Sequence, residues 1–132
     1  MPCPCGSGKT LDACCGRLHA GAMAPSPEAL MRSRNAAYAV GKVDYVLATT
    51  HPAGPHWRAD RAAWARDVRG FCEGTDFEGL VVHGFGVDHD GAAWVDFTAT
   101  LKQGVVDASF RERSRFRPHE GRWAYLEGTH RA

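Results

Sequence analysis

The chain lacks the apolar segments that mark an exported or membrane-anchored protein. No hydrophobic region follows Met1 as it would in a signal peptide, and no stretch is long enough to span a bilayer. Internal repeats and low-complexity runs are also absent. We therefore expect a cytoplasmic protein without a membrane partner, whose 132 residues can bury a single hydrophobic core.

A strong charge imbalance is also missing. The chain has 16 Lys and Arg residues against 15 Asp and Glu, which gives a formal net charge of +1. Bulk electrostatics therefore predicts no affinity for nucleic acid. Aromatic residues, by contrast, are well represented: four Trp, six Phe and three Tyr can supply a small aromatic core.

Cysteine is concentrated at one end of the chain. Four of the five cysteines form a C-x-C pair and, after eight residues, an adjacent pair: Cys3, Cys5, Cys14 and Cys15. Four thiolates around one ion would make a closed site that suits Zn²⁺, with Fe in a rubredoxin-like site as the alternative. The two glycines that flank Ser7 permit sharp turns, and Ser7 and the nearby amides can donate to the sulfurs.

Disulfide bonds are the main alternative for these cysteines. Adjacent cysteines pair with each other only under strain, so two bridges would have to cross between the pairs. Clustered cysteines in a chain without an export signal are more often metal ligands. Redox catalysis is the third interpretation of these cysteines, because no basic residue lies beside the C-x-C pair in the sequence. His19 is a possible replacement ligand, but a surface histidine is the simpler interpretation.

The cysteine-containing segment resembles a known motif. C-P-C-G-S-G-x5-C-C is similar to the SEC-C motif, which is known from the C-terminal metal-binding tail of the SecA translocase. Four later segments resemble the bacterial YchJ-like family: PEALMRSRNAAY at 27–38, THP at 50–52, RERSRF at 111–116 and GRWAYLEG at 121–128.

This resemblance implies a two-part organisation and no established activity. Residues 1–22 would form a SEC-C metal-binding knuckle, which is too short to fold without its ion. Residues 26–132 would form a domain like nuclear transport factor 2, a cystatin-like α+β fold.

The residue pattern of the second part predicts three helices. Ser26 is a good cap for a helix over 27–40, since proline follows it and a glycine ends it. A short helix is expected over 44–50. A third begins near Asp60 and places four apolar residues on one face, namely Trp64, Val68, Phe71 and Cys72. We expect that face to be buried, which makes Cys72 a core thiol.

Four antiparallel strands should follow the helices. The alternating pattern predicts strands over 77–89, 93–102, 106–117 and 122–127. Gly84 and Gly86 suggest a bulge or bend in the first of them. Three helices packed on a curved four-stranded sheet make an α+β fold that would enclose a cavity.

Glu112 and Ser114 are the candidate pocket residues of the third strand. They share a face with two phenylalanines and should point inward, where a carboxylate needs a partner. Arg32, Arg34 and His51 are the candidate partners. One interpretation is an acid–base pair of Glu112 with His51 in a small-molecule enzyme or ligand-binding module. We favour a structural Glu112–Arg pair, because no nucleophile motif or phosphate-binding glycine loop lies nearby.

The opposite face of the same strand carries a row of four arginines, Arg111, Arg113, Arg115 and Arg117. Guanidinium groups match phosphate geometry, so the row could bind RNA. A solvated face partly neutralised by Asp96 and Glu127 is the more usual case. The row could also form a homodimer surface on the sheet.

Three functions remain open from the sequence. The first is a metal-binding accessory protein whose knuckle docks onto a protein partner or the ribosome, with Ser7, Lys9 and Arg17 at the contact surface. The second is an enzyme or ligand-binding module that uses the cavity, and the third is RNA binding. The sequence favours the first and a protein without catalytic residues.

Overall fold

The computed structural model describes residues 1–131, so the last residue of the expected second domain, Ala132, lies outside the described part. Its helices are α1 (Cys15–His19), α2 (Pro27–Val40), α3 (Val43–Ala48) and α4 (Arg61–Glu73). Its strands are β1 (Asp76–Val87), β2 (Ala93–Gln103), β3 (Val106–Asp107), β4 (Phe110–His119) and β5 (Arg122–Arg131).

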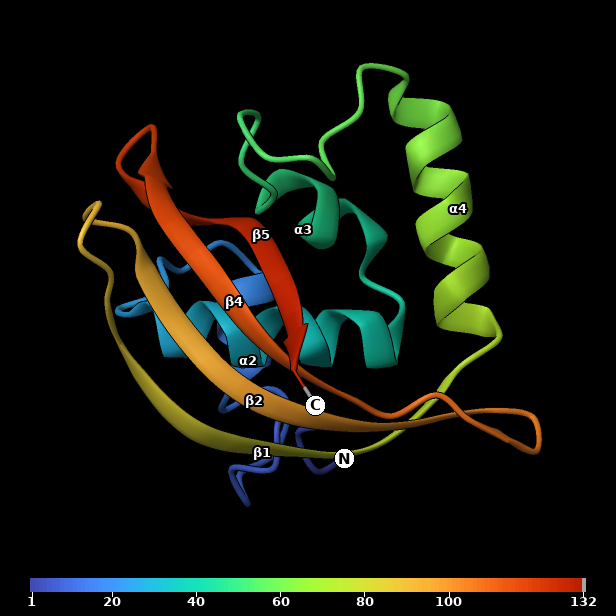
Figure 1. Ribbon diagram of the computed structural model, residues 1–132. Coiled ribbons are helices and arrows are strands. Elements are labelled where there is room, and N and C mark those ends of the chain that lie inside the picture. The colour runs from blue at the N-terminus through green and yellow to red at the C-terminus, as the bar shows by residue number, and fades with distance from the viewer. Residues whose placement is uncertain (132) are drawn as a thin grey trace.

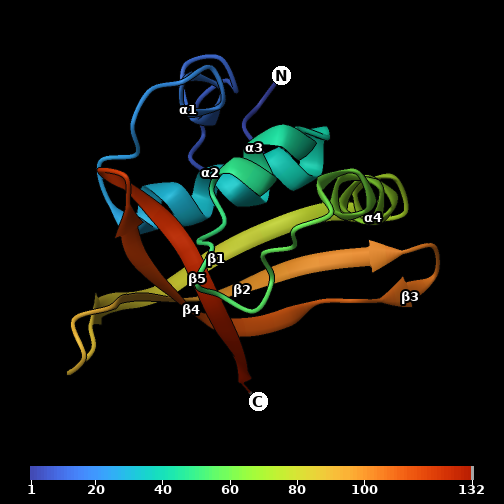
Figure 2. The same cartoon turned by 90° about the horizontal axis from the view of Figure 1, so that it is seen from above.

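The strands form one antiparallel sheet in the order β1-β2-β4-β5, with the short β3 paired to β2. The sheet curves around α2, which lies in its concave side (Figure 1). Viewed from above, α1 and the N-terminal segment lie on the side of α2 away from β4 and β5 (Figure 2). The predicted α+β fold with helices on a curved antiparallel sheet is confirmed.

Helix α2 begins and ends where its capping residues predict. Ser26 Oγ accepts a hydrogen bond of 3.1 Å from the Ala29 amide, and Pro27 occupies the first turn. Gly41 ends the helix in the left-handed region with a φ of 76°. Leu30 and Met31 are buried against the apolar residues of β2. The amphipathic face of α2 therefore forms the floor of the core.

The predicted third strand is not continuous. Ala108 and Ser109 separate β3 from β4, because the Ser109 side chain takes a place in the ladder of hydrogen bonds. Its hydroxyl accepts from the Leu101 amide at 3.0 Å and donates to the Leu101 carbonyl at 3.3 Å. The last strand is longer than predicted and extends to Arg131.

The short helix α3 ends two residues earlier than predicted. The hydroxyl of Thr49 donates to the Tyr45 carbonyl at 2.7 Å, and that of Thr50 donates to the Val46 carbonyl at 2.8 Å. These bonds satisfy carbonyl groups at the helix end without a further helical turn.

Helix α4 begins beside Asp60 as predicted, and Asp60 Oδ1 caps it by accepting a hydrogen bond of 3.0 Å from the Ala63 amide. Its predicted buried face is wrong in part, since only Trp64 is buried and Phe71 is 38% exposed. Val68 and Cys72 are half-buried. The reason is that α4 stands at one end of the curved sheet and covers a cavity instead of the packed core (Figure 1).

The glycines of β1 make room for an aromatic ring on the outer face of the sheet. A Cβ atom at Gly86 would lie 2.8 Å from the Trp94 indole, and one at Gly84 would touch the same ring at 3.8 Å. The guanidinium of Arg113 covers the indole at 3.9 Å from the ring centroid. The predicted irregularity in β1 is present as register shifts between Phe77 and Gly79 and between Val82 and Gly84.

Most of the arginine row on this outer face is paired with carboxylates. Arg111 holds both oxygens of the buried Asp96 at 2.9 and 3.2 Å, and this bond lowers the pKa of Asp96. Arg115 contacts Asp88 at 3.1 Å and Glu127 at 2.6 Å. Asp90 pairs with Arg115 and Arg117. The row therefore presents little uncompensated positive charge.

We predict that Gly86→Val lowers the free energy of unfolding by about 1–3 kcal/mol, because the new side chain must displace the Trp94 indole. Urea denaturation measures the change. Gly70 in α4 is the matched control, since a Cβ there meets no atom within 4 Å, and Gly70→Ala should stabilise the protein by about 0.5–1 kcal/mol. Equal stability of Gly86→Val and the wild type would contradict this role of the glycine.

Candidate metal centre and neighbouring cavity

The four N-terminal cysteines converge on one point. Cys3 and Cys5 come from the first loop, Cys14 precedes α1 and Cys15 is its first residue. Their Sγ atoms all lie within 4.8 Å of one another, with 3.6 Å between Cys5 and Cys14 and 4.0 Å between Cys14 and Cys15. A tetrahedral ion with metal–sulfur bonds of about 2.3 Å needs sulfur–sulfur distances of about 3.8 Å. The cluster is therefore compatible with metal binding.

Backbone hydrogen bonds close the first loop around these thiols. The Cys3 amide donates to the Lys9 carbonyl and the Leu11 amide donates to the Met1 carbonyl, each at 2.9 Å. Gly6 and Gly8 turn the chain between the two halves with φ values of 81° and 85°, which a side chain would oppose. The predicted need for glycine at these turns is thus explained.

The thiols differ in how readily they ionise. Burial opposes ionisation of Cys14, but a hydrogen bond from Ser7 at 3.2 Å and contacts with the other thiols outweigh it, so that its pKa is lowered to about 7. Burial raises the pKa of Cys3 and Cys15. Four adjacent thiolates would repel one another, and a bound cation would supply the opposing charge.

The knuckle, residues 1–22, is packed against the second part of the chain. Ala36 of α2 is fully buried among the cysteines, and Leu80 of β1 packs on the same cluster. Arg32 donates from Nη1 to the Cys5 carbonyl at 2.9 Å and from Nε to Glu28 at 3.0 Å. Arg32 was expected at the pocket, and it instead anchors the metal loop to α2.

A second anchor is a histidine that was expected on the surface. His19 Nε2 lies 2.8 Å from the Ser33 carbonyl, and its ring packs edge-on against Tyr45 with centroids 4.7 Å apart. The Ser33 and Tyr45 hydroxyls are joined at 2.7 Å. Burial lowers the pKa of His19, which favours the neutral ring. Its partners lie in α2 and α3, so no local pattern could have revealed this role.

A cavity of about 530 Å³ lies between α2, α4 and the concave face of the sheet. Of the predicted pocket residues, Arg34, Glu112 and Ser114 line it, whereas Arg32 and His51 do not. The His51 ring accepts a hydrogen bond from the Ala53 amide at 3.0 Å and lies 5.2 Å from the His119 ring. His56 lines the cavity instead.

Glu112 has hydroxyl partners and no arginine. Its carboxylate accepts from the Ser114 hydroxyl, and the Tyr125 hydroxyl lies 3.5 Å away. His130 Nε2 is 3.6 Å from the other oxygen. The favoured Glu112–Arg pair is therefore absent among residues 1–131, and so is a Glu112–His51 pair. The observed partners of Glu112 could not be predicted from the sequence, because they depend on which side chains of β5 face the carboxylate.

A glycine in β5 creates the space for this carboxylate. A Cβ atom on Gly128 would overlap the Glu112 carboxyl group. Burial, followed by the negative charge of Glu112, raises the pKa of Tyr125, so its hydroxyl stays protonated and can donate. The sequence analysis missed both Tyr125, which lines the cavity, and Gly128, which makes room for Glu112, although both lie in the segment that resembles the YchJ-like family.

Comparison with known proteins identifies both parts of the chain. The SEC-C motif matches residues 2–17, and the description "YchJ, middle NTF2-like domain" matches residues 26–128. The chain belongs to the YchJ-like family. The resemblance found in the sequence is confirmed, including the SEC-C motif and the domain like nuclear transport factor 2.

Individual relatives of this YchJ-like protein agree. A UPF0225 protein of Deinococcus radiodurans is 43% identical over 130 residues, which cover 97% of this chain and 88% of the relative. A SEC-C motif containing protein from Rhodopseudomonas palustris is 42% identical, with a TM-score of 0.78 over 98% of each chain. One from Psychrobacter arcticus is 22% identical with a TM-score of 0.72, covers 98% of this chain and 82% of its own, and shows the fold alone.

We predict that Ser7→Ala weakens metal binding by about tenfold, because the sulfur of Cys14 loses a hydrogen-bond donor outside the metal's own ligands. Competition with a chromophoric chelator measures the affinity. Thr129→Ala is the control, since Thr129 is exposed on β5. The metal affinity of this variant should equal that of the wild type. Unchanged affinity in Ser7→Ala would show that the hydroxyl does not support the site.

Proposed function

We propose that this YchJ-like protein is a zinc-binding accessory protein of the cytoplasm, whose SEC-C knuckle docks onto a protein partner or the ribosome. The observation that carries the proposal is the convergence of four sulfurs within 4.8 Å on a loop that is otherwise exposed. A site closed by four thiolates leaves no open position for substrate, so its ion is structural. Zn²⁺ is favoured over Fe because it gives a redox-inert site.

The knuckle is suited to recognition because it combines a fixed base with an exposed tip. Its base is held to α2 by two hydrogen bonds, one from Arg32 to the Cys5 carbonyl and one between His19 and the Ser33 carbonyl. Lys9 and Arg17 are exposed, and neither forms an ion pair with a described residue. Unpaired positive charges on a rigid knuckle can bind an acidic surface without the entropy cost of ordering the knuckle.

The other two functions have less support. The arginine row is largely paired with Asp88, Asp90, Asp96 and Glu127, which weakens the argument for RNA binding. The acid–base pair on which an enzyme would depend is not assembled, since His51 lies outside the cavity.

No helix in residues 1–131 has both the length and the apolar character needed to cross a membrane.

The proposal predicts that reversing the knuckle charges weakens docking and leaves the ion in place. The double variant Lys9→Glu/Arg17→Glu should bind purified ribosomes or co-purified protein partners at least tenfold more weakly than the wild type, as measured by cosedimentation and by quantitative affinity capture. Its metal content should stay at one ion per chain, since both side chains are exposed and neither is a ligand.

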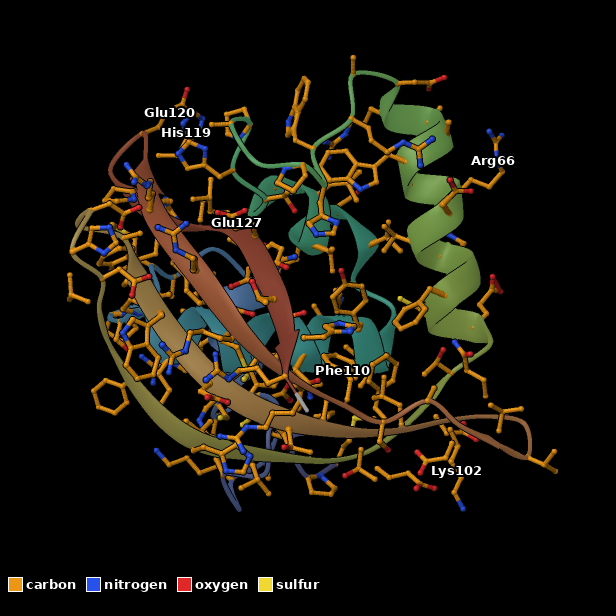
Figure 3. The ribbon with its side chains drawn as sticks, viewed as in Figure 1. Arg66, Lys102, Phe110, His119, Glu120 and Glu127 are labelled. Atoms are coloured by element: carbon orange, nitrogen blue, oxygen red, sulfur yellow. The ribbon has the colours of Figure 1, made fainter. Side chains whose placement is uncertain are left out.

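A matched control reverses two charges elsewhere. Arg66 on α4 and Lys102 on β2 are also exposed, and Figure 3 shows Arg66 on the outer side of α4. Arg66→Glu/Lys102→Glu should bind as the wild type does. Cys14→Ser should lose both the ion and the partner. Full recovery of the same partners by the metal-free Cys14→Ser variant would overturn the docking role.

A further inference from the structure

The cavity above the sheet is a second site that the metal centre does not explain. Its volume of about 530 Å³ lies within the usual range of small-molecule sites, roughly 300–1,000 Å³. The wall is mostly aromatic and aliphatic, with Tyr38, Val68, Phe71, Phe97, Leu101 and Phe110 among its residues. Phe110 projects from the start of β4 (Figure 3). Such a wall favours an apolar ligand body.

One buried cation stands in this apolar wall. Arg34 of α2 is 8% exposed, and no carboxylate of residues 1–131 forms an ion pair with it. Its Nη1 atom donates to the Val46 carbonyl at 3.0 Å, to Thr49 at 2.7 Å and to Thr50 at 3.3 Å. These hydrogen bonds fix the guanidinium in place, but no carboxylate pairs with its charge. Burying an unpaired charge costs free energy.

The remaining edge of the Arg34 guanidinium is free to bind a ligand. Nε and Nη2 donate to no acceptor within residues 1–131. They are also not among the fully buried atoms without partners, which are His19 Nδ1 and Arg113 Nε, so both atoms keep some accessible surface. Arg111 uses the same edge to hold both oxygens of Asp96 at 2.9 and 3.2 Å. This edge matches a carboxylate.

Tyr125 separates Arg34 from the acidic residue of the cavity. The guanidinium lies over the Tyr125 ring at 4.6 Å from its centroid, whereas Glu112 lies at the hydroxyl end of the same side chain. Glu112 already receives hydrogen bonds from hydroxyl groups. A second carboxylate placed near Glu112 would be repelled, so the ligand should carry its one anionic group at Arg34.

We propose that the cavity binds a small planar, apolar molecule with a single carboxylate group. The carboxylate lies on the Nε and Nη2 edge of Arg34, and the apolar body lies among the aromatic side chains between α2, α4 and the sheet. This site is separate from the cysteine cluster, so its ligand binds whether or not the knuckle docks onto a partner.

Naphthalene-2-carboxylate is a suitable probe, and naphthalene-2-carboxamide is its neutral match. Titration of the full chain, followed by amide chemical shifts in NMR spectra, gives the affinity and the site. The carboxylate should bind with a dissociation constant below about 1 mM and shift the amides of α2, α4 and β4. The carboxamide should bind at least tenfold more weakly, because it cannot neutralise Arg34.

Two variants locate the site. Asn35 lines the cavity and makes no side-chain hydrogen bond within residues 1–131, so Asn35→Trp fills the space and should abolish binding. Arg66→Trp is the control, because Arg66 points away from the sheet on the outer side of α4 (Figure 3). Arg34→Met should reduce binding of the carboxylate at least tenfold, with dispersed NMR spectra verifying that it folds.

Three results would overturn the proposal. They are a wild-type protein that does not bind the carboxylate below about 1 mM, equal affinity for carboxylate and carboxamide, and full binding by a folded Asn35→Trp variant. Equal affinity of the two probes would show an apolar cavity without a role for the Arg34 charge. None of these results bears on the metal centre.

Discussion

The contact on which the structure depends is the one between the cysteine cluster and helix α2. Four thiols occupy a volume in which four negative charges could not coexist without a cation, and the loop that carries them has few other buried groups. Arg32 joins this loop to α2 through the Cys5 carbonyl. The small side chain of Ala36 lets the cysteine cluster pack closely against α2. A metal ion would thus shape the loop, and α2 would fix its orientation.

Helix α2 serves two sites because neighbouring positions point in opposite directions. Arg32 and Arg34 are two residues apart, about 200° around the helix axis. The first faces the knuckle and the second faces the cavity. Both guanidinium groups bind backbone carbonyl groups, at Cys5 and Val46, and so hold the metal loop and α3 to the helix. Helix α2 therefore carries residues of both sites on one rigid element.

The sequence predicted those features that local chemistry determines. The cysteine spacing indicated one cluster, Ser26 and Gly41 marked the ends of α2, and alternation along β2 indicated the sheet. The errors concern contacts between distant residues. Arg32 lies 27 residues from Cys5 in the sequence, and no local pattern around either residue predicts their hydrogen bond. Glu112 was expected to pair with arginine, yet the space beside it is set by a glycine on another strand.

The central claim is that the four N-terminal sulfurs bind one ion. X-ray absorption at the metal edge tests it most directly, on reduced protein purified without added metal. We predict one zinc ion per chain with four sulfur ligands at about 2.3 Å and no nitrogen or oxygen ligand. A metal-free protein, an ion with fewer than four sulfur neighbours, or cysteines joined in disulfides would contradict the account.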